Sequence, residues 1–243
     1  DEQTILDTLG LAGNLETAKL MSHIAGRDAA AALQNYTPEL AQAVREGESK
    51  TDHYEDILGT YLVKLSALKI SENDSSEAAM LLKALSDFER IGDHALNLVE
   101  SAEELKSKNL ALSDAARHEL NVLLRAVEEI VDMTFQAFRD DDLEKAYRVE
   151  PLEQVIDDLK EKMRIHHILR MQQGSCSIES GFVWSDLLTA LERVGDHCSN
   201  IAGCIIDLHH HNMNTHEAIR SARMENENFD DEYKAYAVKY SLK

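Results

Sequence analysis

The sequence predicts an all-α protein, a tandem repeat of two three-helix bundles with six long antiparallel helices. Apolar residues recur at helical spacing along most of the 243 residues, and only two prolines and ten glycines interrupt them. Eleven residues also occur twice, at 88–98 and 191–201, with six positions identical. A repeat at a fixed offset, here 103 residues, indicates two copies of one structural unit.

The order of the helices follows from the breaks between the periodic segments. The predicted helices span 14–34, 38–71, 76–107, 113–140, 142–172 and 178–212. Polar runs typical of turns separate them, at 35–38, 71–76, 106–109, 140–142 and 172–175. Grouped by repeat, they give a lead-in with the first three-helix repeat at 1–108, a second repeat at 109–212, and a polar C-terminal tail or short helix at 213–243.

Composition excludes several classes of partner. A formal net charge of −20 repels the phosphate backbone of nucleic acids and anionic lipid headgroups, so no nucleic-acid partner is expected. No apolar run in this chain approaches the roughly 18 residues of a transmembrane segment, and no signal peptide is visible. The cysteines show no metal-ligand or disulfide spacing, which indicates reduced thiols in a cytoplasmic protein. They are Cys176, Cys198 and Cys204.

The repeated motif places two carboxylates on one flank of its helix. Glu89 and Asp93 are four residues apart, so they are stacked neighbours, and they lie about 90–130° from the apolar stripe. Glu192 and Asp196 occupy the same positions in the second repeat. The preceding helix of each repeat has the same Glu-x-x-x-Asp spacing, at 48–52 and 153–157. If neighbouring helices are antiparallel, four carboxylates face one gap in each repeat.

Such a gap suits a cation, because carboxylate oxygens bind hard divalent ions and iron, and the ion offsets the repulsion between the acids. A solvated acidic face is the alternative for any single pair. Arg90 and Arg193 are expected to form ion pairs, and Gly92 and Gly195 are expected to allow close helix approach.

Other motifs point away from metal binding and from catalysis. His94 and His197 follow their aspartates on another face of the helix. Consecutive histidines at 166–167 and 209–211 point in different directions, so they are expected to be exposed and unpartnered. Nothing in the chain is typical of a phosphate-binding loop, a nucleophile elbow or a catalytic triad, and no enzyme activity is predicted. A di-metal oxidase or hydrolase would need a base on the acidic face, where the sequence has none.

The duplicated Glu-Arg-(Ile/Val)-Gly-Asp-His-x-x-Asn, with its upstream acid pairs, resembles the signature of the PhoU family of phosphate-transport regulators. The resemblance covers roughly 14–210 and implies two similar three-helix bundles. It also implies divalent or transition metal ions as cofactors (iron, zinc, manganese or magnesium), in some members as multinuclear clusters. Carried over by position, the metal ligands expected are Glu48, Asp52, Glu89, Asp93, Glu153, Asp157, Glu192 and Asp196.

Two settings are known within the family, and they imply different partners. In one, a free-standing regulator associates with a phosphate ABC transporter and a sensor kinase. In the other, the domain is the cytoplasmic C-terminal part of a sodium/phosphate cotransporter and contacts the membrane domain in cis. The absent start methionine, the helical lead-in at 1–15 and the acidic tail after 212 favour the cotransporter. The expected location is therefore the cytoplasm, at the inner face of the plasma membrane.

Several alternatives stay open at this stage. The free-standing regulator is one, and a metal-free helical adaptor that works by protein contact alone is another. Phosphate is expected either to bind open positions on the metal or not to bind this domain at all, since bare acids repel it. The sequence does not decide whether the chain forms a homo-oligomer.

Overall fold

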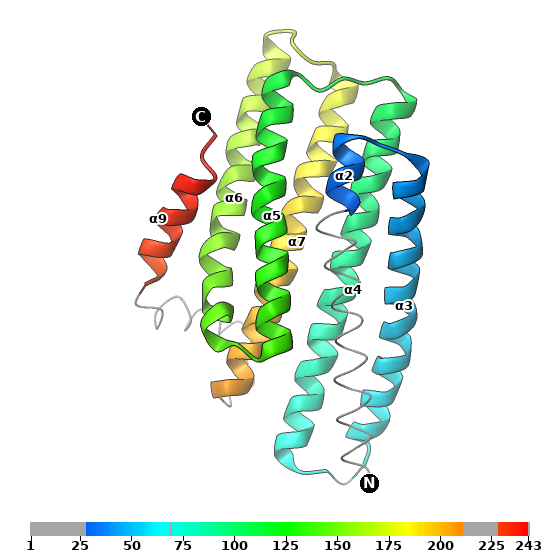
Figure 1. Ribbon diagram of the computed structural model, residues 1–243, viewed down its shortest axis with the longest axis vertical. Helices are drawn as coiled ribbons and strands as arrows, with labels where there is room; N and C mark the ends of the chain where they lie inside the picture. The colour runs from blue at the N-terminus through cyan, green and yellow to red at the C-terminus, as the bar shows by residue number, and fades with distance from the viewer. Residues whose placement is uncertain (1–27, 69, 211–227, 243) are drawn as a thin grey trace.

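The computed structural model describes residues 28–68, 70–210 and 228–242, and these ranges contain helices and no strand. The helices are α2 (Ala29–Gln34), α3 (Pro38–Ser66), α4 (Glu72–Ser107), α5 (Asp114–Asp140), α6 (Leu143–Gln172), α7 (Ile178–His210) and α9 (Phe229–Lys239). Figure 1 shows the five long helices running along the long axis, with α9 against α6. The all-α prediction is confirmed.

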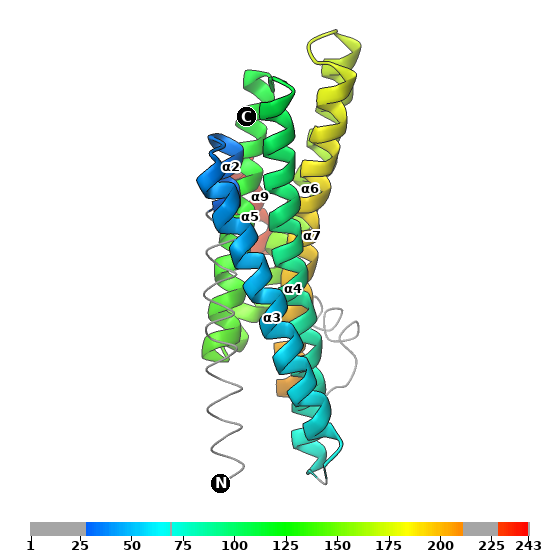
Figure 2. The ribbon, with the colours of Figure 1, turned by 90° about the vertical axis from the view of Figure 1, so that its right-hand side faces the viewer.

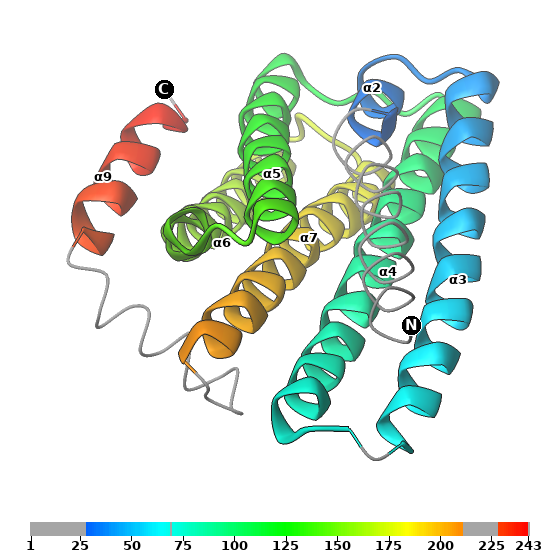
Figure 3. The ribbon, with the colours of Figure 1, turned by 60° about the horizontal axis from the view of Figure 1, so that its bottom comes forward.

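The helices form two bundles that share a central contact. In the first, α2 and α3 pack on α4; in the second, α5 and α6 pack on α7. Among the described helices, the most extensive contact joins α4 to α7, which carry the repeated motif, and Figure 3 shows them in the middle of the described helices. The α3–α4 and α6–α7 turns lie at opposite ends of the long axis (Figure 2). The predicted tandem repeat is therefore confirmed.

Helix starts follow the capping side chains. Thr37, Ser113 and Asp142 each accept a hydrogen bond from a backbone N–H three residues on, at the starts of α3, α5 and α6. The turn predicted at 71–76 is wrong: α4 begins at Glu72, because Ser71 and Asp74 form a reciprocal capping box. Helix α3 accordingly ends at Ser66, earlier than the expected residue 71.

Some predicted segments fall outside the described residues. They are the lead-in at 1–13, residues 14–27 of the first predicted helix, residues 211–212 of the sixth, and residues 213–227 and 243 of the tail. Within the rest of the tail, α9 packs on α6 and buries Tyr236 and Tyr240. Its Lys239 Nζ lies 2.6 Å from Glu129 Oε2 on α5, and its Tyr233 hydroxyl donates to Asp158 on α6. This short helix is therefore attached to the second bundle by both apolar and polar contacts.

One hydrophobic core runs through both bundles and across the α4–α7 contact. Ile91 of α4 and Leu191 of α7 are fully buried, and burying a side chain of that size contributes about 1.5–3 kcal/mol. At the same contact the rings of His94 and His197 stack with their centroids 5.4 Å apart. These are equivalent residues of the two repeats, so the copies pack together in an approximately symmetric way.

The described helices include none that is both long and apolar enough to cross a membrane. No disulfide joins the three cysteines. Cys198 and Cys204 are buried, and burial raises the pKa of each to about 12, whereas Cys176 is half-buried.

Candidate functional site

The eight predicted acids lie on the flanks of α3, α4, α6 and α7, and none of them is buried. The two motif pairs are exposed to nearly the same extent. The side chains of Glu89 and Asp93 are 18% and 33% exposed, and those of Glu192 and Asp196 are 15% and 34% exposed. The repeat therefore places both pairs in matching surroundings, at the edge of the core rather than inside it.

In the first repeat, the acids of α3 face those of α4. Burial, and then the negative charges of Asp52 on α3 and Asp93 on α4, raise the pKa of Glu48. The pKa of Glu89 is raised to about 7 by burial and then by Asp93, with further contributions from Glu55 and Asp52, while Arg90 opposes the shift. We call Glu48, Asp52, Glu55, Glu89 and Asp93 the first acidic cluster.

In the second repeat, the acids of α6 face those of α7. Glu153 lies beside Gly195, since a methyl group added at that glycine would be 3.9 Å from the Glu153 Cγ. Asp157 and Glu192 share the ammonium of Lys160, whose Nζ is 3.8 Å from Asp157 Oδ1 and 2.8 Å from Glu192 Oε1. We call Glu153, Asp157, Glu192 and Asp196 the second acidic cluster.

The motif arginines pair along their own helices, as predicted. Arg90 Nη1 is 3.1 Å from Asp93 Oδ2, and Arg193 Nη1 is 3.2 Å from Asp196 Oδ2. Each arginine also approaches the glutamate before it, with Nε–O distances of 3.5 and 3.9 Å. One guanidinium thus partly neutralises each motif pair at the outer edge of its cluster.

The donor atoms of the clusters are chemically suited to an oxygen-preferring cation, but the side chains are not arranged around a common centre. Their donors are carboxylates from two facing helices, which bind ions such as Mg²⁺, Mn²⁺ and iron. The pKa of Glu89 is raised first by burial and then by the charges of neighbouring carboxylates, which a bound cation would offset. Within the described ranges, however, no three His, Cys, Asp or Glu side chains are arranged to hold a metal ion. Binding would require the carboxylates to turn toward a shared centre.

Sequence reasoning missed Glu55, a member of the first cluster, and Lys160, which contacts acids of the second. Each lies three residues after the second acid of its upstream pair, on the same side of the helix. Aligning the upstream pairs of the two repeats would have shown them at equivalent positions.

The prediction of exposed, unpartnered consecutive histidines holds for exposure at His209 and His210, but it is wrong for the burial of His167 and for the absence of partners. His166 Nδ1 is 2.7 Å from Glu119 Oε1, and the buried His167 stacks on Trp184. His209 contacts Asp141 in the turn between α5 and α6, and His210 contacts Tyr147 near the start of α6. His211 lies outside the described residues. Packing between helices supplies these partners, so spacing along one helix could not reveal them. His94 and His197 lie on another face from the acid pairs, as expected: their rings stack at the α4–α7 contact, and His197 Nδ1 is 2.8 Å from Asp87 Oδ1 of α4.

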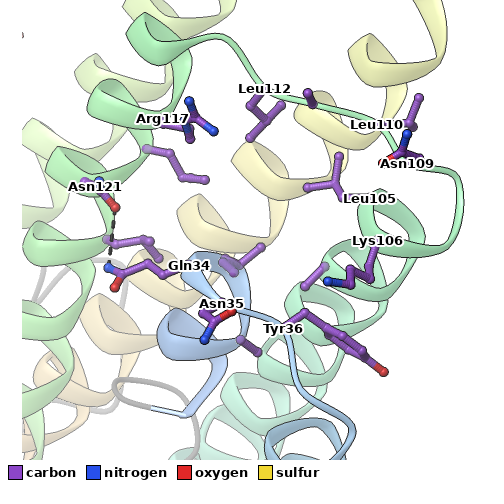
Figure 4. A pocket seen from close by; sticks show the side chains of 16 residues that line it. Gln34, Asn35, Tyr36, Leu105, Lys106, Asn109, Leu110, Leu112, Arg117 and Asn121 are labelled. Atoms are coloured by element: carbon purple, nitrogen blue, oxygen red, sulfur yellow. Dashed lines mark hydrogen bonds between the residues drawn. The ribbon is translucent and has the colours of Figure 1, made fainter.

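A cavity of about 540 Å³ lies away from both acidic clusters, between α2, the end of α4 and the start of α5 (Figure 4). Its described lining includes Lys106 and Arg117 and no carboxylate. The amide Nε2 of Gln34 donates to Asn121 Oδ1 across one side, at 3.4 Å. The remaining wall is largely apolar, with Leu33, Leu105, Leu110, Leu112, Leu120 and Leu124. Its volume lies within the range of small-molecule pockets.

The fold and the clusters define an all-helical tandem repeat with paired acids on equivalent helices. The family model of the PhoU domain matches residues 19–102 and 120–205, one match in each repeat. The chain therefore belongs to the PhoU domain family.

Curated relatives include phosphate-specific transport system accessory proteins. PhoU homolog 1 of Thermotoga maritima is 31% identical over 126 residues, which cover 52% of this chain and 53% of that protein. The PhoU homolog of Deinococcus radiodurans is 27% identical over 177 residues, 72% of this chain and 81% of that protein. The chain thus matches only about half the length of the first relative and most of the second.

Two crystal structures have the same fold. PhoU from Pseudomonas aeruginosa superposes with a TM-score of 0.77 at 24% identity, covering 82% of this chain and 95% of that one. The phosphate transport system regulatory protein PhoU from Streptococcus pneumoniae gives 0.74 at 20% identity, covering 84% and 94%. At these identities the structural likeness establishes the fold alone.

Proposed function

We propose that this chain regulates phosphate transport by binding rather than by catalysis. The observation that carries the proposal is the duplicated acidic cluster at equivalent, partly exposed positions of a rigid two-bundle frame. Membership of the PhoU domain family supports it, as do relatives named for an accessory role in phosphate-specific transport. A surface of this kind presents charge to a partner, and nothing in it requires a chemical step.

The proposed ligands of the clusters are metal ions, held in the first repeat by Glu48, Asp52, Glu89 and Asp93 and in the second by Glu153, Asp157, Glu192 and Asp196. A bound ion would neutralise the acids and offer positive charge to a phosphate oxygen or a partner's carboxylate. The protein's own part is to keep the carboxylates partly exposed, so that an ion can reach them and still meet a second molecule.

The relatives support a free-standing accessory regulator, acting with a phosphate transporter and a sensor kinase, better than they support the cotransporter domain. Both proposals place the chain in the cytoplasm, at the inner face of the plasma membrane. Sequencing the complete reading frame decides between them: apolar segments of about 20 residues before Asp1 would establish the cotransporter.

Metal analysis tests the binding proposal. Protein purified without a histidine tag is exchanged into buffer with iron, zinc, manganese or magnesium, dialysed and analysed for bound metal. We expect the Asp93→Ala, Asp196→Ala double variant to retain much less metal than the wild type. A matched double variant at exposed acids outside the clusters, Asp114→Ala with Glu161→Ala, should retain the wild-type amount.

Equal metal content in the wild type and the cluster variant would refute metal binding at these acids. Capture of the partner protein distinguishes a metal-dependent regulator from a metal-free adaptor. A metal-free adaptor predicts no thermal stabilisation by any of the four metals, and unchanged binding of the transporter or kinase by the cluster variant. If regulation depends on metal, the cluster variant should lose both the thermal stabilisation by metal and the binding of the partner.

A further inference from the structure

The two acidic clusters differ by one reversed charge at an equivalent position. The upstream pairs Glu48–Asp52 and Glu153–Asp157 align at an offset of 105 residues. The same offset aligns Glu55 with Lys160. The first cluster therefore has a fifth carboxylate where the second has an ammonium group.

Lys160 lies among the acids rather than in solvent. Its side chain is 22% exposed, and its Nζ contacts Glu192 of the neighbouring helix at 2.8 Å and Asp157 of its own helix at 3.8 Å. Burial, and then the charge of Glu192, raise the pKa of Asp196, and the charge of Lys160 opposes this rise together with Arg193 and His197. A cation is thus already seated between α6 and α7, supplied by the chain itself.

The first cluster shows the opposite situation. Glu55 is half-buried, and it adds to the negative charge that acts on Glu89 across the α3–α4 interface. The cation that this cluster does have, the Arg90 guanidinium, is paired with the motif acids of α4. The upstream acids of α3 have no equivalent of Lys160, because Glu55 occupies the equivalent position in the first repeat.

We propose that Lys160 is the resident cation of the second acidic cluster, so that a divalent ion from solution is taken up by the first cluster in preference to the second. An ion entering the second cluster must displace the ammonium group or bind beside it, and either costs electrostatic free energy. An ion entering the first cluster meets one additional carboxylate. Two unit charges a few ångströms apart at a protein surface are enough to change affinity by about tenfold or more.

This inference rests on the proposed uptake of metal ions, and charge-reversal variants test the two separately. Mn²⁺ alone is the probe, titrated calorimetrically into chelator-stripped wild type, Glu55→Lys, Lys160→Glu and Lys160→Gln. Lys162→Glu is the matched control, because it makes the same charge change two residues away at an exposed position outside the cluster. Melting temperatures are measured in chelator for every variant.

We expect the wild type to show one class of tight sites, which Glu55→Lys weakens by about tenfold or more. Lys160→Glu should add a second class, and Lys162→Glu should leave the titration unchanged. In chelator, Lys160→Gln and Lys160→Glu should lower the melting temperature and Mn²⁺ should restore it, whereas Glu55→Lys should raise it. Lys160→Gln keeps the proposal testable if the reversed charge prevents folding.

Three results would contradict these statements in distinguishable ways. Two equal classes of sites in the wild type, unchanged by either substitution, would overturn the inference and leave metal binding intact. Binding that responds equally to Lys162→Glu would show a non-specific charge effect, which also overturns it. No Mn²⁺ uptake by any variant would refute the proposed metal binding and the preference with it. The melting temperatures in chelator would still decide whether Lys160 neutralises the second cluster.

Discussion

Removing Glu119 should destabilise the second bundle, because it breaks a nearly buried ion pair. Glu119 of α5 accepts from Arg170 of α6 at 2.9 Å, with side chains only 10% and 11% exposed. The Arg170 Nε and Nη2 groups have no hydrogen-bond acceptor, although the guanidinium lies 5.3 Å from the centre of the Trp184 ring. In Glu119→Ala the buried positive charge therefore retains only an aromatic contact.

The expected cost follows from that burial. Removing one partner of a buried pair costs about 3–5 kcal/mol, and the contact with Trp184 places this case in the lower part of that range. For a domain of about 150–250 residues, each kcal/mol lowers Tm by roughly 2–4 °C. Glu119→Ala should thus lower Tm by about 6–12 °C, measured by calorimetry and by urea unfolding at pH 7.

A surface pair of the same length supplies the control. Arg164 and Glu161 are also 2.9 Å apart, but their side chains are 64% and 45% exposed. Exposed pairs contribute about 0–1 kcal/mol, so Glu161→Ala should leave the free energy of unfolding nearly unchanged. Replacing both buried partners, Glu119→Leu with Arg170→Met, should recover most of the loss. If Glu119→Ala costs no more than Glu161→Ala, burial does not govern this pair and the reasoning is wrong.

Three further predictions concern single residues. Burial, and then the charge of Arg170, lower the pKa of His167 below its usual value. The unfolded chain therefore binds more protons just below pH 6.5, stability falls as the pH drops through that region, and His167→Gln should flatten the dependence in urea unfolding. Gly181→Ala should destabilise the protein, because the new Cβ would lie 3.0 Å from His167 Nε2. Gly195→Ala should be neutral or stabilising by up to about 1 kcal/mol, since its Cβ would lie at an ordinary 3.5 Å from Ile156. Equal changes in Tm for the two variants would contradict this. Of the three thiols, the half-buried Cys176 should react with a thiol reagent in the native state much faster than the other two, and equal rates for all three would contradict the burial described.

The positions of the helices were largely predictable, because helical periodicity is a local property of the chain. A residue's place in the 3.6-residue turn determines whether it faces the core, so Ile91 and Leu191 could be assigned to the interior and the motif acids to the flanks. The start of α4 was not predicted from its polar first turn. The reciprocal hydrogen bonds of Ser71 and Asp74 extend that helix toward its N-terminus.

Contacts between helices account for what sequence reasoning missed. His166 and His167 look alike as neighbours in the sequence, yet one contacts Glu119 and the other stacks on Trp184. The close approach expected at Gly195 exists, but it does not require a glycine, since an added methyl group would make ordinary contacts. Neither result could be predicted from the sequence of one helix, because each depends on how two neighbouring helices are aligned along their axes.

By itself, the sequence determined the all-helical repeat, the family and the four acid pairs, since these depend on composition and on spacing along one helix. Only the tertiary structure decided which charges meet across helices. It placed Lys160 against Glu192 in one repeat and left Glu55 among acids in the other. Helix register brings side chains distant in sequence within a few ångströms, and electrostatic interactions depend on that separation. The charge reversal between Glu55 and Lys160 can be read from the aligned repeats, but only the folded chain brings each charge against the acids of the neighbouring helix.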